Sequence, residues 1–175
     1  MEQQRGFTLI EMIVAVGLFS VVMLISVGAL LSLVGANRKA QALQSVMNNL
    51  SIAVDGMVRS IRMGSGYSCD AGGDCAGGGD VFSFVPFGGG DRWFFYEDGG
   101  RLYRSTTGST FDGQPLTAPE IRIDTLKFYA IGTTPGDTVQ PKVVIELQGT
   151  AGTDKMKTTT TFSIQATAVQ RILDI

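Results

Sequence analysis

The chain has 175 residues, a formal net charge of −2, no histidine and two cysteines. A charge this close to zero creates no strong positive field of the kind that attracts nucleic acid, so no nucleic-acid partner is predicted. Without histidine the chain lacks the commonest general base and metal ligand. The sequence contains no cofactor motif and no phosphate-binding loop, and we predict a protein that is not an enzyme and that binds no cofactor.

The first predicted element is an apolar helix. From Met12 to Ala36 no residue is charged, and apolar side chains occur on every helical face. A run of this length, at about 1.5 Å per residue, can cross the roughly 30 Å hydrocarbon core of a membrane. Because backbone polar groups in lipid must be satisfied within the segment, we expect a helix. The run is too long for a cleavable secretory signal, and it continues past Arg38 in a helical pattern.

One carboxylate, that of Glu11, lies just inside the apolar run. A plain membrane anchor explains the length of the run but not this residue. An acid at the centre of a membrane helix costs about 2.5–3.5 kcal/mol, and less near the interface. Arg5 lies six residues upstream on another helix face, and we expect no nearby residue to offset the charge. Either Glu11 lies at the level of the lipid headgroups, or it pairs with a group on another chain.

The segment Gly6-Phe7-Thr8-Leu9-Ile10-Glu11 joins a short leader to the long apolar helix. This arrangement resembles the type IV prepilins and pseudopilins. The resemblance implies that a membrane-embedded prepilin peptidase cuts between Gly6 and Phe7 and methylates the new amine of Phe7. It also implies that Glu11 pairs with the N-terminal amine of a neighbouring subunit in a helical filament. A free ammonium and a carboxylate are each costly in lipid, and each compensates the other.

The same resemblance implies partners and a location. The expected partners are other pilin or pseudopilin subunits, the prepilin peptidase, an assembly platform in the inner membrane, and the lipid bilayer. The expected topology is a single span of the inner membrane. The N-terminus lies in the cytoplasm before cleavage, and the C-terminal domain lies in the periplasm or outside the cell. Because Arg38 and Lys39 flank the far end of the apolar run, this orientation follows from the resemblance and not from the positive-inside rule.

Beyond Ala36 the helical pattern becomes amphipathic. Apolar residues recur at three- and four-residue spacing and form one stripe: Leu43, Met47, Leu50, Val54, Met57 and Ile61. No proline interrupts residues 7–63, so we predict one continuous helix of about 55 residues that ends at Gly64 and Gly66. The stripe is expected to pack on the C-terminal half of the chain.

A glycine-rich loop is predicted over residues 65–80. It contains Cys69 and Cys75, and an even number of cysteines in an exported domain favours a disulfide that closes a short loop. Two reduced thiols are the alternative. Three aspartates of the same segment form a weak candidate for a calcium site: Asp70, Asp74 and Asp80. Their spacing matches no EF-hand, and acids in such loops are usually solvated, so no metal is predicted.

From Asp80 the pattern alternates with a period of two, which is typical of strands. Predicted strands cover residues 81–85, 92–97, 101–104, 121–131, 142–147 and 158–169, and residues 106–119 are predicted as a loop. Asp98-Gly99-Gly100 is a hairpin signal. In the strand 121–131 the apolar side changes near Thr125, which predicts a bulge or a twist.

These elements predict an α+β fold in which a long N-terminal helix packs on a small antiparallel β-sheet, as in pilins. The expected divisions are a leader (1–6), a transmembrane half-helix (7–36), an amphipathic half-helix (37–64) and a globular β-sheet domain (65–175). The order of the strands and hairpins is loosely similar to that of the J-type minor pseudopilins of type II secretion.

Three functions fit the sequence. The first is a structural filament subunit, a pseudopilin or a minor pilin. The second is a type IV pilin for adhesion, motility or DNA uptake. The third belongs to another class and is a membrane-anchored, monomeric binding domain. An uncut leader in the native protein would favour the third.

Overall fold

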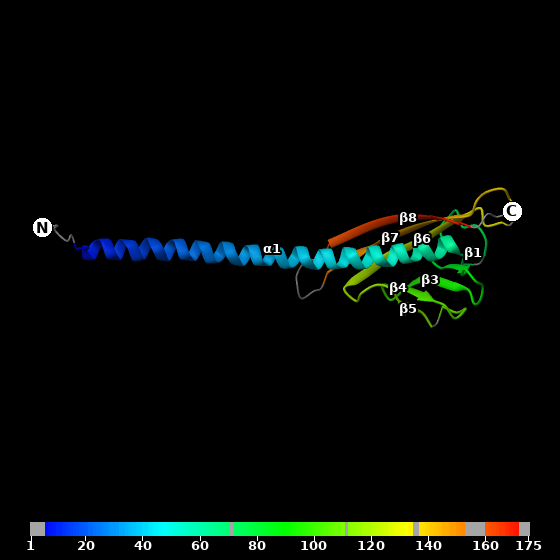
Figure 1. The fold of residues 1–175 in the computed structure, drawn as a ribbon, viewed down its shortest axis with the longest axis horizontal. Coiled ribbons are helices and arrows are strands. Elements are labelled where there is room, and N and C mark those ends of the chain that lie inside the picture. The colour runs from blue at the N-terminus through cyan, green and yellow to red at the C-terminus, as the bar shows by residue number, and fades with distance from the viewer. Residues whose placement is uncertain (1–5, 71, 111, 135–136, 153–159, 172–175) are drawn as a thin grey trace. The chain divides into compact units, whose positions relative to one another are not determined.

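The computed structural model describes residues 6–70, 72–110, 112–134, 137–152 and 160–171 (Figure 1). The chain divides into two compact units, Met1–Gln41 and Ala42–Ile175, and each is described by itself. One helix, α1 (Leu9–Met63, 55 residues), contributes to both units. The predicted continuous helix is therefore confirmed.

In the first unit, α1 is apolar and exposed on all sides. Its large apolar side chains from Leu9 to Val34 are 40–78% exposed. Among the described residues α1 alone is long and apolar enough, by length and composition, to cross a membrane. Such a surface needs lipid or other helices to cover it, because a helix that is apolar all round is normally buried.

In the second unit, the last turns of α1 bury one face. Its buried residues are Leu50, Ala53, Val54, Met57 and Ile61. Four of the six residues of the predicted stripe are among them, but Met47 is 47% exposed and Leu43 is half-buried. Val46, one residue before Met47, packs against the core instead. The buried row thus passes through residues 46, 50, 53 and 57 at three- and four-residue steps, which leaves Met47 beside it.

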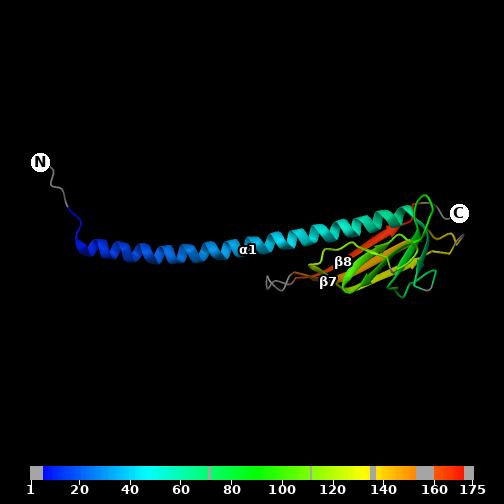
Figure 2. The same cartoon turned by 90° about the horizontal axis from the view of Figure 1, so that it is seen from below.

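The described strands form two antiparallel sheets, where a single sheet was predicted. The first sheet has the order β1 (Ser65–Cys69), β2 (Phe82–Val85), β3 (Trp93–Asp98), β4 (Arg101–Ser105) and β5 (Gln114–Pro115). The second has the order β6 (Ile121–Ile131), β7 (Lys142–Ala151) and β8 (Thr160–Val169). Figures 1 and 2 show the three long strands of the second sheet side by side.

Two of these strands, β1 and β5, lie in segments predicted as loops. The strand β5 has no apolar pattern, and in β1 only Tyr67 and Cys69 alternate with small or polar residues, which is too short a signal to predict a strand. The pairing of β1 with β2 is irregular between Ser65 and Ser68, and Gly66 within it has φ +61°. The strand β5 has two residues, one of them Pro115. They form because the neighbouring strands of the sheet supply hydrogen-bond partners for their backbone groups. Local sequence does not indicate this pairing.

The predicted bulge in β6 is confirmed. The pairing of β6 with β7 shifts register between Ile123 and Thr125. One extra residue there moves the following side chains to the other face. As a result Ile123 and Leu126 are both buried, although they are three positions apart and would face opposite sides of a regular strand.

The core of the second unit lies between the two sheets and α1. Four phenylalanines of the sheets are 0–1% exposed: Phe82, Phe84, Phe95 and Phe128. The rings of Phe82 (β2) and Phe128 (β6) stack with centroids 5.4 Å apart, which joins the two sheets. The hydroxyl of Tyr67 (β1) donates to the carbonyl of Ile61 at 2.6 Å and ties the first sheet to α1.

Replacing Leu50 with alanine is expected to lower the free energy of unfolding by about 2–5 kcal/mol, because its side chain is fully buried. The exposed Gln44, on the same helix, gives a matched control, and Gln44→Ala is expected to stay within about 0.5 kcal/mol of the wild type. Urea unfolding of the detergent-solubilised chain measures both. Equal losses of unfolding free energy in the two variants would show that the helix face of Leu50 is not the face that packs on the sheets.

Candidate functional site

The start of α1 is fixed by two side chains that bond to each other. The backbone N–H of Thr8 donates to Glu11 Oε2 at 3.0 Å, and the Thr8 hydroxyl donates to the same oxygen at 2.8 Å. In return, the Glu11 N–H donates to the Thr8 hydroxyl oxygen at 3.4 Å. Thr8 is the residue before the helix and Glu11 is its third residue, so the pair forms a capping box.

The expectation that no nearby residue stabilises the Glu11 carboxylate in the apolar run is therefore corrected. Thr8 supplies two hydrogen bonds, although it brings no positive charge. Among the described residues Glu11 has no ion-pair partner. The pattern Thr8-x-x-Glu11 was the signal that sequence reasoning missed. The carboxylate is therefore held in one place, while its charge stays uncompensated within the described chain.

Gly6 and Phe7 precede the helix and are exposed. Phe7 is 82% exposed, and a Cβ built on Gly6 would meet nothing within 4 Å. Gly6 is also absent from the residues with left-handed backbone. The fold of this chain thus gives no reason for a glycine at residue 6, and a requirement there must come from another molecule. The remainder of the predicted leader, residues 1–5, lies outside the described residues.

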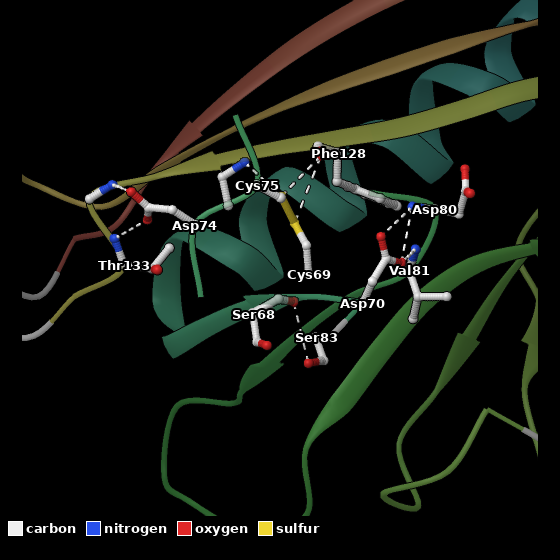
Figure 3. The surroundings of a disulfide bond; sticks show 12 residues. Ser68, Cys69, Asp70, Asp74, Cys75, Asp80, Val81, Ser83, Phe128 and Thr133 are labelled. Carbon is white, nitrogen blue, oxygen red and sulfur yellow. Dashed lines mark hydrogen bonds between the residues drawn. A yellow bond between two sulfur atoms is a disulfide. The ribbon is translucent and has the colours of Figure 1, made fainter. Parts of the chain in front are cut away.

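The structure joins Cys69 and Cys75 by a disulfide, with their Cα atoms 6.0 Å apart (Figure 3). The two sulfurs lie 3.8 and 3.2 Å from the carbonyl oxygen of Phe128, and these are contacts because bonded sulfurs carry no proton to donate. The N–H of Ala130 points at the Cys75 sulfur at 3.2 Å. The disulfide therefore sits against the outer edge of β6.

The glycine-rich segment that contains the disulfide also bonds to this edge through its backbone. The N–H of Cys75 donates to the carbonyl of Ala130 at 2.9 Å. Gly79 and Phe128 exchange two backbone hydrogen bonds, at 2.8 and 2.9 Å. The described residues of the glycine-rich segment therefore lie along the outer edge of β6 and are hydrogen-bonded to it.

The three aspartates of this segment, which were the weak candidate for a calcium site, do not form one cluster in the structure. Asp70 accepts hydrogen bonds from the N–H groups of Asp80 and Val81, and Asp80 forms an ion pair with Lys127 at 2.7 Å. Asp74 accepts from the N–H groups of Thr133 and Gly132, at 2.7 and 3.2 Å (Figure 3). Across the described residues no three acidic, cysteine or histidine side chains could hold a metal ion.

The bonds from Thr133 and then Gly132 hold the pKa of Asp74 below its usual value. The ionised carboxylate is the better acceptor, so this anchor is present above the usual pKa of an aspartate. It is lost as the pH falls through the lowered pKa. At neutral pH, Asp74 thus fixes the end of the disulfide loop to the turn after β6.

Cys69 and Cys75 are expected to resist an alkylating agent in protein isolated without reductant. A bridge across so short a loop stabilises the fold by roughly 2–3 kcal/mol at most, so its loss should loosen the loop and leave the sheets folded. Mass spectrometry after alkylation, with and without prior reduction, measures the two thiols. Full labelling before reduction would contradict the bridge.

One comparison of the chain with known protein families gives a match. Residues 1–27 match the family described as the prokaryotic N-terminal methylation motif. The comparisons with curated proteins and with solved structures give no match. The matched segment contains Gly6, Phe7 and Glu11, and it supports a type IV prepilin-like chain that is processed at its N-terminus. The similarity of the globular domain to J-type minor pseudopilins receives no support from these comparisons.

Proposed function

We propose that the chain is a structural subunit, a pseudopilin or minor pilin, of a membrane-rooted type IV pilus or type II secretion filament. The observation that carries the proposal is the methylation motif of residues 1–27, which opens a long apolar helix whose side chains are exposed on all faces. The motif supports processing, and the exposed helix supplies the surface through which processed subunits pack.

Processing assigns a role to Gly6 and Phe7. The peptidase cuts between them and methylates the amine of Phe7. The exposure of Phe7, and the open space around Gly6, leave this segment accessible to an enzyme. Because the fold does not need a glycine at residue 6, recognition by the peptidase is the reason that we give for it.

Assembly assigns a role to Glu11. Cleavage creates an ammonium on Phe7, and each subunit then carries one cation and one anion at the level of the membrane. Thr8 occupies Oε2 of Glu11, while Oε1 accepts no hydrogen bond among the described residues. We propose that Glu11 binds the ammonium of a neighbouring subunit, because two charges that are costly in lipid then compensate each other.

Close helix packing explains three further glycines. A Cβ at Gly17, Gly28 or Gly35 would meet nothing within 4 Å, so the fold of this chain does not require them. A glycine inside a helix costs roughly 0.5–1 kcal/mol relative to alanine. Small residues let the backbones of membrane helices approach closely. We propose that these glycines face helices of other subunits.

Location follows from the same proposal. The first half of α1 spans the inner membrane, with the N-terminus in the cytoplasm before cleavage. The globular domain lies in the periplasm or outside the cell, and a disulfide between Cys69 and Cys75 suits such an oxidising compartment. The assembly platform of the inner membrane and the prepilin peptidase are the further partners.

A strain that lacks the gene for this chain tests the proposed function and distinguishes a type II secretion subunit from a type IV pilus subunit. A type II secretion subunit predicts loss of protein secretion with pili intact, and a pilus subunit predicts the reverse. In either case, the wild-type gene should restore the activity, and antibody should detect the processed chain in purified filaments. A processed chain that stays in the membrane fraction while both activities continue would contradict the proposal.

A further inference from the structure

The two sheets have four edge strands, which are β1, β5, β6 and β8. In the described part of the chain, three of these edges are short, irregular or covered by other segments. The strand β1 has five residues and an irregular register, and the guanidinium of Arg92 donates to the carbonyl of Gly66 within it at 2.7 Å. The strand β5 has two residues and includes Pro115, which has no N–H to offer. Short, irregular and proline-containing strands are the usual means of blocking the edge of a sheet.

The third edge, that of β6, is covered by other segments. Gly79 pairs with Phe128, Cys75 donates to Ala130, and the N–H of Ile123 donates to the carbonyl of Gly100 at 2.8 Å. The glycine-rich segment and the β3–β4 turn therefore bond to backbone groups of Ile123, Phe128 and Ala130 that β6 directs away from β7. A further strand could pair along β6 only by displacing these segments.

The fourth edge, that of β8, has none of these features. β8 has ten residues, Thr160–Val169, with no charged residue, glycine or proline. Its pairing with β7 runs without a register shift. Apart from that pairing, residues 160–169 take part in no hydrogen bond to the described part of the chain. In an antiparallel sheet alternate residues of an edge strand direct their N–H and C=O groups outward.

We propose that β8 accepts an extended strand of a partner protein, which adds a fourth strand to this sheet. A long, regular and uncharged edge is a template for such pairing, and main-chain hydrogen bonds supply the affinity. The proposal concerns the globular unit and does not depend on the processing of the N-terminus.

The side chains of β8 define the chemistry of this partner. Phe162, Ile164 and Ala166 pack against the core and remain half-buried, whereas Ser163 and Gln165 between them are exposed. A strand added beside β8 continues both faces of the sheet. Its side chains are therefore apolar at every second position, where they extend the core past Phe162 and Ile164, and polar at the positions between.

The structure supplies a probe with this pattern. The sequence of β7, KVVIELQGTA, is largely apolar at alternate positions. In the structure β7 already pairs with the edge of β8 that lies opposite to the proposed binding edge. A fluorescent peptide of this sequence should bind the full-length chain, purified in detergent, in a saturable manner that fluorescence anisotropy measures. A peptide of the same composition in scrambled order is the control. No saturable binding of the ordered peptide, or equal binding of the scrambled one, would overturn the proposal.

Two neighbouring proline substitutions locate the binding to the edge. Gln165 and Ala166 are adjacent, so one of them directs its N–H to β7 and the other directs it outward. The outward one tolerates proline, since an edge strand loses no internal hydrogen bond there. Of Gln165→Pro and Ala166→Pro, the variant that keeps the wild-type melting temperature should bind the peptide at least tenfold more weakly. Wild-type affinity in that folded variant would overturn the proposal.

Amide exchange of the wild-type chain gives a result that does not depend on either variant. Saturating peptide should slow the exchange of alternate N–H groups in β8 and leave those of β1 unchanged. Binding without protection of β8 would place the peptide elsewhere and overturn the proposal.

Discussion

Replacing Gly6 with valine is expected to leave the chain uncut and to abolish its recovery in filaments. A Cβ at residue 6 meets nothing within 4 Å in the chain, so the substitution leaves the fold intact and acts on the peptidase alone. The loss should be close to complete, because the resemblance to prepilins places the cut directly after this residue. Immunoblots that separate precursor from mature chain measure the result.

A second glycine provides the control for this experiment. Gly17 also lies in open space, and Gly17→Ala changes no residue near the cut. This variant should be cleaved like the wild type. Normal cleavage of Gly6→Val would show that the peptidase does not read Gly6 and would remove the main support for processing at this site.

Glu11→Gln is expected to give a chain that is inserted, cleaved and folded normally but is almost absent from filaments. Glutamine at the third helical residue can still accept the hydrogen bond of the Thr8 N–H, so the capping box is kept while the charge is lost. An ammonium of a neighbouring subunit would then lose its partner in a low-dielectric site, at a cost of about 3–5 kcal/mol. The ratio of filament to membrane protein measures the loss.

Thr8→Ala separates the charge of Glu11 from its capping role. This variant removes the side-chain half of the capping box, at a cost of about 0.5–2 kcal/mol to the helix start, and keeps the carboxylate. It should enter filaments far better than Glu11→Gln. If Glu11 instead pairs with the amine of its own chain, four residues away on the same helix face, then Glu11→Gln should assemble close to wild type.

The helix could be predicted except for its first two residues, since α1 begins at Leu9 and not at Phe7, because its signal is long and local. The uncharged run and the amphipathic stripe each span many turns, and Gly64 follows the last helical residue. The exposure of Met47 was not predictable from spacing, since Val46 and Met47 both fit a stripe that continues to Leu50. Contact with the sheets selects Val46.

Six of the eight described strands were predicted, but β1, β5 and the grouping into two sheets were not. The turn at Asp98 and the bulge near Thr125 are local features, and both are present. Division into two sheets depends on which strands lie side by side, and β1 forms only because β2 pairs with it. Such long-range pairing leaves little trace in a single sequence.

The candidate site divides in the same way. Gly6, Phe7 and Glu11 form one continuous motif, and the family match covers them. The capping box was present in the sequence as Thr8-x-x-Glu11, and its spacing was sufficient to predict it. The cover of β6 by the disulfide loop joins Cys75 to Ala130, 55 residues apart, and no local pattern predicts it.

The mass of the native N-terminal peptide tests the central claim most directly. Protein isolated from membranes and from filaments is digested, and the first peptide is identified by tandem mass spectrometry. The proposed function predicts a peptide that begins at Phe7 and carries one methyl group on its amine. A native chain that begins at Met1 in both fractions would contradict processing, and with it the account of Glu11 as the partner of a new N-terminal amine.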